Sequence, residues 1–127
     1  MIKIIYMLFA LGLMLAVASA NDSFVLTSFK DAKFLSESTE KPILLIFGTN
    51  SCKFCTELKS AIFVEPLKSA TDKYIICYLD LDENPELKQE YDISIIPDSR
   101  IIKNNKQISG IKGYTESNYL KWLNNVK

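Results

Sequence analysis

Histidine is absent from the 127-residue sequence. A Cys-His nucleophile, a Ser-His-Asp triad and a histidine-ligated metal site therefore cannot be assembled within this chain. Cysteine is scarce as well, because Cys52, Cys55 and Cys77 are the only three thiols. A zinc site built from thiolates alone needs about four ligands, so we predict that the protein binds no metal.

An excess of either charge is also lacking. Fifteen basic and fifteen acidic side chains cancel, and neither sign forms a long run. Such a chain has no extended field to hold nucleic acid or an anionic membrane surface, so we predict no nucleic-acid partner. There is no internal repeat, low-complexity stretch or interdomain linker, and a hydrophobic content of 48% is typical of one small domain.

The first twenty residues differ in composition from the rest. Lys3 is their one charged side chain, residues 4–17 form a nearly continuous apolar run, and small residues end the segment at Ala20. This pattern is typical of an export signal, and we predict a signal peptide at residues 1–20 that is cleaved near Ala20. The alternative is an uncleaved anchor, because the run approaches the roughly 17 to 25 residues that span a bilayer. After cleavage, residues 21–127 would work in the periplasm or another extracytoplasmic space, where disulfides persist.

Strand and helix patterns alternate along the mature chain. The continuous apolar run at 41–48 is typical of a strand buried on both faces of a parallel sheet. Asn84 is suited to cap a helix that begins at Pro85, and Pro66 should interrupt the helix that follows the first two cysteines. The full set is strands at 24–27, 41–48 and 74–82, helices at 28–38, 54–62, 84–91 and 115–127, and a hairpin at 99–112. We therefore predict an α/β fold with a mixed sheet covered on both faces.

Cys52 and Cys55 are three positions apart at the expected start of a helix. Unpaired backbone N–H groups and the helix dipole favour an anion there, so we expect a lowered pKa for Cys52. Lys53 adds a nearby cation, although an exposed lysine contributes little. Cys55 should lie one turn deeper on the apolar face, protonated until it reacts. The spacing predicts that Cys52 attacks a disulfide and that Cys55 resolves the mixed disulfide.

A purely structural disulfide is the alternative for this pair, and it is common in exported proteins. A bridge across two intervening residues constrains little of the unfolded chain, so it would add less stability than a bridge that closes a long loop. A redox role is therefore favoured. Cys77, in the middle of an expected strand, is interpreted as a buried small hydrophobic residue.

The mature chain resembles the thioredoxin family over nearly its whole length. The resemblance is carried by "ILLIF" running into the CxxC helix, by "YLDLDENPELKQEYDISIIP", and by "KNNKQISGIKGYTESNYLKWL". CxxC alone is weak support, but the later Ile96-Pro97 and Gly113 in register make it strong. The resemblance implies a thioredoxin fold, with a central mixed sheet of four to five strands flanked by about four helices.

Within the superfamily, the segment from Cys52 to Pro85 is similar to exported thioredoxin-like domains, including the C-terminal domain of the membrane electron transporter DsbD. The shared pattern is an aromatic, an acid and a proline at 63, 65 and 66. This resemblance implies a cis Ile96-Pro97 peptide that faces the cysteines and binds an extended substrate segment through its backbone. It also implies a reductant or electron relay, with a membrane thiol reductase as electron donor.

Two departures concern the proton chemistry. Thioredoxin has a tryptophan before the first cysteine and a buried aspartate six residues before it, where this chain has Ser51 and Ile46. The lysine that pairs with that aspartate corresponds to Tyr78. Without the buried acid, Cys55 lacks the usual proton acceptor, and water or a partner would have to serve.

A third departure follows Pro97, where the family favours threonine and this chain has Asp98. An aspartate beside the site is expected to raise the pKa of Cys52 and to repel acidic partners.

We therefore predict an exported thiol–disulfide oxidoreductase that acts on disulfide-containing client proteins and needs no cofactor beyond the Cys52–Cys55 pair. The alternative is a non-catalytic thioredoxin-fold module that holds a peptide at the Pro97 groove while its disulfide stays locked.

Overall fold

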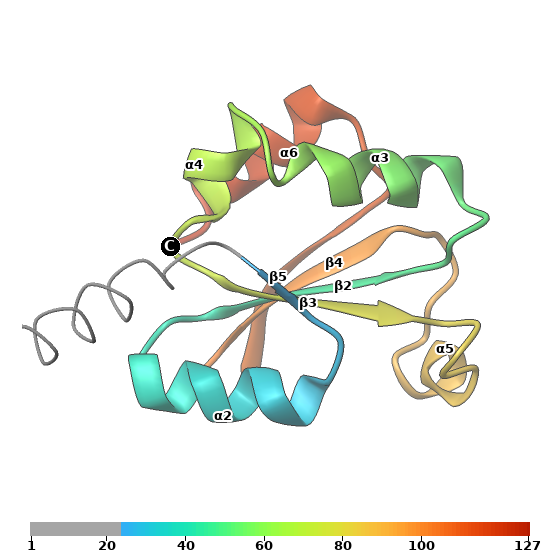
Figure 1. The fold of residues 1–127 in the computed structure, drawn as a ribbon, viewed down its shortest axis with the longest axis horizontal. Coiled ribbons are helices and arrows are strands. Elements are labelled where there is room, and N and C mark those ends of the chain that lie inside the picture. Colours follow the sequence, from blue (N-terminus) through green and yellow to red (C-terminus); the bar gives the residue numbers. More distant parts are fainter. Residues whose placement is uncertain (1–23) are drawn as a thin grey trace, which may run out of the picture.

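A five-stranded mixed sheet runs through the centre of residues 24–127, the part of the chain that this computed structural model describes (Figure 1). The predicted signal peptide and its cleavage point lie outside these residues. The strand order is β1-β3-β2-β4-β5, with β1, β3 and β2 parallel and β4 and β5 antiparallel to their neighbours. The strands are β1 (Val25–Leu26), β2 (Ile43–Gly48), β3 (Ile75–Asp80), β4 (Asp98–Lys103) and β5 (Lys106–Lys112).

Within residues 24–127, five helices flank the sheet: α2 (Phe29–Thr39), α3 (Lys53–Ala61), α4 (Leu67–Thr71), α5 (Glu86–Glu90) and α6 (Glu116–Asn125). In Figure 1, α3, α4 and α6 lie on one side of the sheet, whereas α2 and α5 lie on the other. The structure confirms the predicted thioredoxin fold and mixed sheet, with five strands.

β2 is buried along its whole length because both faces of the sheet are covered. Leu44 and Ile46 pack in the core under α3, α4 and α6, which also contains Leu58 and Tyr119. Residues 43, 45 and 47 pack on the opposite face in a second core with Ala32 of α2. The continuous apolar run therefore supplies two cores from alternate positions.

The predicted hairpin and closing helix are both present. Asn104 and Asn105 connect β4 to β5 with φ angles of 53° and 64°, the left-handed conformations that a tight hairpin turn requires. Thr115 caps α6, because its hydroxyl oxygen accepts a hydrogen bond from the backbone N–H of Asn118 at 3.3 Å.

The region after the cysteines holds two helices, which raises the total above the predicted four. α3 ends at Ala61, and α4 begins only at Leu67, with Pro66 in its N-cap position. Proline has no backbone N–H and cannot continue a helix from within, so the interruption expected at Pro66 separates two helices.

The start of α5 and the first strand differ from the prediction by a few residues. Pro85, not Asn84, occupies the N-cap position of α5. The Asn84 side chain instead donates a hydrogen bond to the Asp80 carbonyl oxygen at 3.0 Å, which ties the turn to the end of β3. The strand expected at 24–27 is limited to Val25–Leu26. No helix in the described residues is long and apolar enough to cross a membrane.

Candidate active site

Cys52 and Cys55 form a disulfide at the N-terminus of α3. Cys52 is the N-cap residue, and its sulfur accepts a hydrogen bond from the backbone N–H of Cys55 at 3.2 Å. The two Cα atoms are 5.2 Å apart, within the range that a disulfide spans. The predicted position at the helix start is confirmed, and a backbone amide points at the sulfur of Cys52.

The two cysteines differ in accessibility. Cys55 is 0% exposed, whereas Cys52 is partly exposed at the surface. Phe54, between them, is 52% exposed, and Ile95 is 53% exposed. Another protein can therefore reach Cys52 but not Cys55, across a surface that carries apolar side chains.

The Ile96-Pro97 peptide is cis and lies beside Cys52. The sulfur of Cys52 is 3.9 Å from the Ile96 carbonyl oxygen. The Pro97 carbonyl oxygen accepts a 2.7 Å hydrogen bond from the backbone N–H of Gly113, whose φ of 81° favours glycine. The structure thus brings Ile96 and Pro97 to Cys52 and holds them there through the connection from β5 to α6, while their binding of a client stays a prediction.

Tyr78 lies next to Cys55 across the end of β2. A methyl group added at Gly48 would overlap the Tyr78 hydroxyl and would lie 2.9 Å from the Cys55 sulfur, so both groups border the same small space. The hydroxyl donates a long hydrogen bond of 3.5 Å to the carbonyl oxygen of Thr49. Burial raises the pKa of Tyr78, and the charge of Asp80 raises it further. Sequence reasoning identified Tyr78 only as a departure from the family; the signal it passed over was Gly48, a residue without a side chain at the end of a buried strand.

Asp98 has a partner that the sequence analysis missed. Its carboxylate is 2% exposed and forms an ion pair with Arg100 at 3.0 Å. Arg100 also donates a 2.6 Å hydrogen bond to the Tyr91 carbonyl oxygen and lies over the ring of Phe47, with 5.4 Å between its guanidinium carbon and the ring centroid. Asp98 is opposite Phe47 in the sheet, so this pair is on the face covered by α2 and α5. Cys55 is a buried residue of α3, which lies on the other side of the sheet (Figure 1).

Lys53 and Cys77 are separate from this cluster. Lys53 is exposed as the first residue of α3. Cys77 is 0% exposed, and burial raises the pKa of its thiol to about 12, as suits the predicted small hydrophobic residue. Within residues 24–127, no three or more potential metal-ligating side chains gather into a group.

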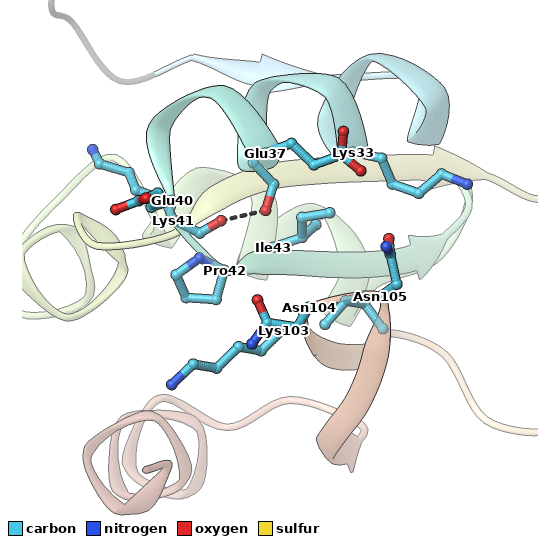
Figure 2. Close-up of a pocket in the computed structure, with 11 residues that line it drawn as sticks. Lys33, Glu37, Glu40, Lys41, Pro42, Ile43, Lys103, Asn104 and Asn105 are labelled. Atoms are coloured by element: carbon cyan, nitrogen blue, oxygen red, sulfur yellow. Dashed lines mark hydrogen bonds between the residues drawn. The ribbon is translucent and has the colours of Figure 1, made fainter.

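A hollow of about 390 Å³ lies between α2 and the turn that connects β4 to β5 (Figure 2). Figure 2 shows Lys33 and Glu37 of α2 on one side and Lys103 with the following turn on the other. Ile43, the first residue of β2, lines it, whereas the cysteine pair follows Gly48, the last residue of that strand. This hollow is therefore remote from the disulfide, and its mixed charges select no ligand of one sign.

Known proteins of one family match most of the chain. The thioredoxin family model matches residues 25–125. The thioredoxin of Rickettsia prowazekii is 32% identical over 97 residues, which cover 74% of this chain and 91% of that protein. The thioredoxin of Rickettsia bellii is 32% identical over 88 residues, 68% of this chain and 83% of that protein. The crystal structure of Fasciola hepatica thioredoxin has a TM-score of 0.65 at 21% identity and covers 81% of this chain and 98% of that one.

The sequence matches and the fold agree with the geometry, in which a disulfide-forming CxxC pair occupies the start of α3 beside a cis proline. The chain belongs to the thioredoxin family of thiol–disulfide oxidoreductases.

Proposed function

We propose that the protein works outside the cytoplasm as a reductant or electron relay for disulfide-containing client proteins. The observation that carries this proposal is the asymmetry of the cysteine pair. Cys52 is partly exposed and receives a backbone N–H at the helix start, whereas Cys55 is buried directly behind it. An accessible sulfur for attack and a shielded sulfur for resolution are what disulfide exchange needs.

The reaction begins from the reduced pair. The thiolate of Cys52 attacks one sulfur of a client disulfide, which forms a mixed disulfide and releases the other client sulfur as a thiolate. Cys55 then loses its proton and attacks the sulfur of Cys52. The Cys52–Cys55 bond forms, the bond to the client breaks, and the second client sulfur leaves as a thiolate that water protonates. Two electrons have passed to the client.

The surroundings of Cys52 suit a peptide partner. The exposed side chains of Phe54 and Ile95 offer apolar contacts, and the Ile96 backbone lies next to the reacting sulfur. A surface hollow of about 210 Å³, lined in part by Leu81 and Ile93, borders Ile96 and has room for a client side chain. An extended client segment would pair with the backbone at 96–97, in the manner of an added strand.

The direction and the compartment rest on sequence features. The apolar segment before Ala20 supports export, and the resemblance to exported thioredoxin-like domains that the sequence of residues 52–85 suggests supports a reductant. A protein that reduces clients outside the cytoplasm must itself be reduced, so we propose a membrane thiol reductase as its electron donor. The exchange uses the cysteine pair as its only redox group.

Reduction of insulin by dithiothreitol tests the exchange reaction. The mature protein should accelerate insulin precipitation, and Cys52→Ser should abolish the acceleration. Cys77→Ala is the matched control, because Cys77 is buried away from the pair and should leave the rate unchanged. Equal rates for wild type and Cys52→Ser would favour the binding module with a locked disulfide.

The reduction potential of the Cys52–Cys55 pair tests the direction. Equilibration with glutathione buffers should give a value toward the reducing end of the range for known dithiol proteins, which extends from roughly −270 to −120 mV. A potential near −120 mV would overturn the reductant assignment and leave the exchange activity standing.

A further inference from the structure

A neutral hydroxyl, that of Tyr78, borders the Cys55 sulfur. Ile46 of β2 is buried in the core under α3, and its partner on the neighbouring strand β3 is Tyr78. The Tyr78 hydroxyl and the Cys55 sulfur border the same space above Gly48, which is too small for a methyl group. Tyr78 is thus the polar side chain that the strands bring to the buried sulfur.

The hydroxyl is free to change partners. In the oxidised protein it donates to the Thr49 carbonyl oxygen over 3.5 Å, the long end of the hydrogen-bond range. Neither sulfur of a disulfide carries charge, so the oxidised pair competes weakly for this donor. A thiolate is a much stronger acceptor, and hydrogen bonds to charged groups are about twice as strong as those between neutral groups. Once the pair is reduced and Cys55 is ionised, the nearby thiolate is therefore a better hydrogen-bond acceptor for the Tyr78 hydroxyl than the Thr49 carbonyl oxygen.

We propose that Tyr78 donates a hydrogen bond to the thiolate of Cys55 in the resolving step, an inference that rests on the proposed function. Cys55 gives its proton to water, and the resulting thiolate accepts the Tyr78 O–H while it approaches the sulfur of Cys52. The Cys52–Cys55 bond then forms, the bond between Cys52 and the client breaks, and the client thiolate takes up a proton from water. Tyr78 keeps its proton throughout.

The role of donor, rather than base, follows from the charge state of the phenol. Burial raises the pKa of Tyr78 above its ordinary value near 10, so it is protonated at neutral pH. Lys59 of α3 lies 4.5 Å from the centroid of the ring, and Asp80 acts on Tyr78 from β3. Both charges stay in place when the hydroxyl alone is removed, so Tyr78→Phe isolates its contribution.

A single-turnover reaction with an aromatic disulfide, 5,5′-dithiobis(2-nitrobenzoate), separates the two cysteines. Reduced protein in excess releases one coloured thiolate when Cys52 attacks and a second when Cys55 resolves, and Cys55→Ser identifies the second phase by abolishing it. The two phases are followed by stopped flow between about pH 5 and 9 for wild type, Tyr78→Phe and Tyr74→Phe. Tyr74 is the control, because it is a buried tyrosine on the same face of the sheet.

We expect Tyr78→Phe to leave the first phase unchanged and to raise the pH midpoint of the second phase by about one unit. Below that midpoint the second phase should be about tenfold slower, and at high pH the rates should converge because the thiolate is then fully formed. Tyr74→Phe should behave as wild type. An unchanged midpoint, or equal slowing at every pH, would overturn the role of Tyr78, since a packing defect has no reason to follow the ionisation of Cys55.

Wild-type protein without any second phase would overturn the proposed function and this inference together.

A spectroscopic measurement on the unaltered tyrosine provides an independent test. In Cys52→Ser protein labelled with carbon-13 at the tyrosine Cζ, the Tyr78 signal should shift with the same midpoint as Cys55 ionisation. A Tyr78 chemical shift that does not change as Cys55 ionises would also overturn the inference.

Discussion

The two faces of the sheet differ sharply at the end that carries the disulfide. On one face, the buried sulfur of Cys55 in α3 and the uncharged hydroxyl of Tyr78 border the same space above Gly48. Under α2 and α5, the same strands bury an ion pair between Asp98 and Arg100. On the α3 face a neutral hydroxyl therefore borders the redox-active pair, whereas the other face buries an ion pair that holds the chain together.

Placing the buried ion pair on the face away from Cys55 has a physical advantage. A buried charge near a sulfur shifts its ionisation by several pH units, whereas a neutral donor adjusts it by less. Each face also holds one fully buried thiol or thiol-derived sulfur. Cys55 lies behind the helix start and forms the disulfide, whereas Cys77 lies on the α2 face with a pKa raised to about 12. Burial without a nearby partner keeps the Cys77 thiol protonated and unreactive. Cys55 differs because it lies in the first turn of α3 and forms a disulfide with Cys52.

The largest effect should come from breaking the charged face. Arg100→Met removes the ion-pair partner of Asp98, the hydrogen bond donated to the carbonyl oxygen of Tyr91, and the cation over Phe47. It leaves a buried carboxylate uncompensated, so we expect a loss of about 3–5 kcal/mol in the free energy of unfolding. Denaturant unfolding of the oxidised protein measures it.

A double variant checks whether the cost comes from the orphaned charge. Asp98→Asn combined with Arg100→Met removes both charges, and it should recover a substantial part of the stability lost by Arg100→Met alone. If the double variant is as unstable as the single one, the packing of Arg100 on Phe47 and Tyr91 matters more than its pairing with Asp98.

The next largest loss of stability should come from a substitution at Gly48, beside Cys55 of α3. A methyl group there would overlap the Tyr78 hydroxyl and crowd the sulfur and Cβ of Cys55 at 2.9 and 3.1 Å. Gly48→Ala should therefore cost about 1–3 kcal/mol of unfolding free energy, as overpacking typically does. Gly110→Ala is the matched control, because its methyl group would meet neighbours only at 3.3 Å and beyond. Equal losses for the two variants would show that the space above Gly48 is not tight.

A smaller effect should appear in the pH dependence of stability through Cys77. Its folded pKa of about 12 exceeds the ordinary value near 8.5, so the native state keeps a proton that the unfolded chain releases. This contribution is complete below about pH 8.5 and is lost as the pH rises toward 12. Between about pH 9 and 10, wild type should lose about 1 kcal/mol more unfolding free energy than Cys77→Ala. Identical pH slopes for the two proteins would contradict the burial argument.

The sequence predicted those features that depend on local patterns. The continuous apolar run identified β2, and CxxC after a buried strand identified the helix start at Cys52. The ion pair of Asp98 with Arg100 could have been predicted, because residues two apart in a strand share a face, but Asp98 was interpreted as an unpaired aspartate beside the cysteines. The approach of Tyr78 to Cys55 could not be predicted from the sequence, because it depends on how α3 crosses the sheet and on the space above Gly48.

The smallest expected effect concerns Asp98 and the thiolate of Cys52. The sequence alone predicts that an aspartate after Pro97 opposes ionisation of Cys52, so Asp98→Asn should ease it. In the structure the carboxylate is neutralised by Arg100 and belongs to the face away from α3. We therefore expect Asp98→Asn to lower the pH midpoint of Cys52 alkylation by iodoacetamide by less than about 0.5 unit. A fall of a full unit would show that the charge acts through the sheet, and that the two faces are electrostatically one site.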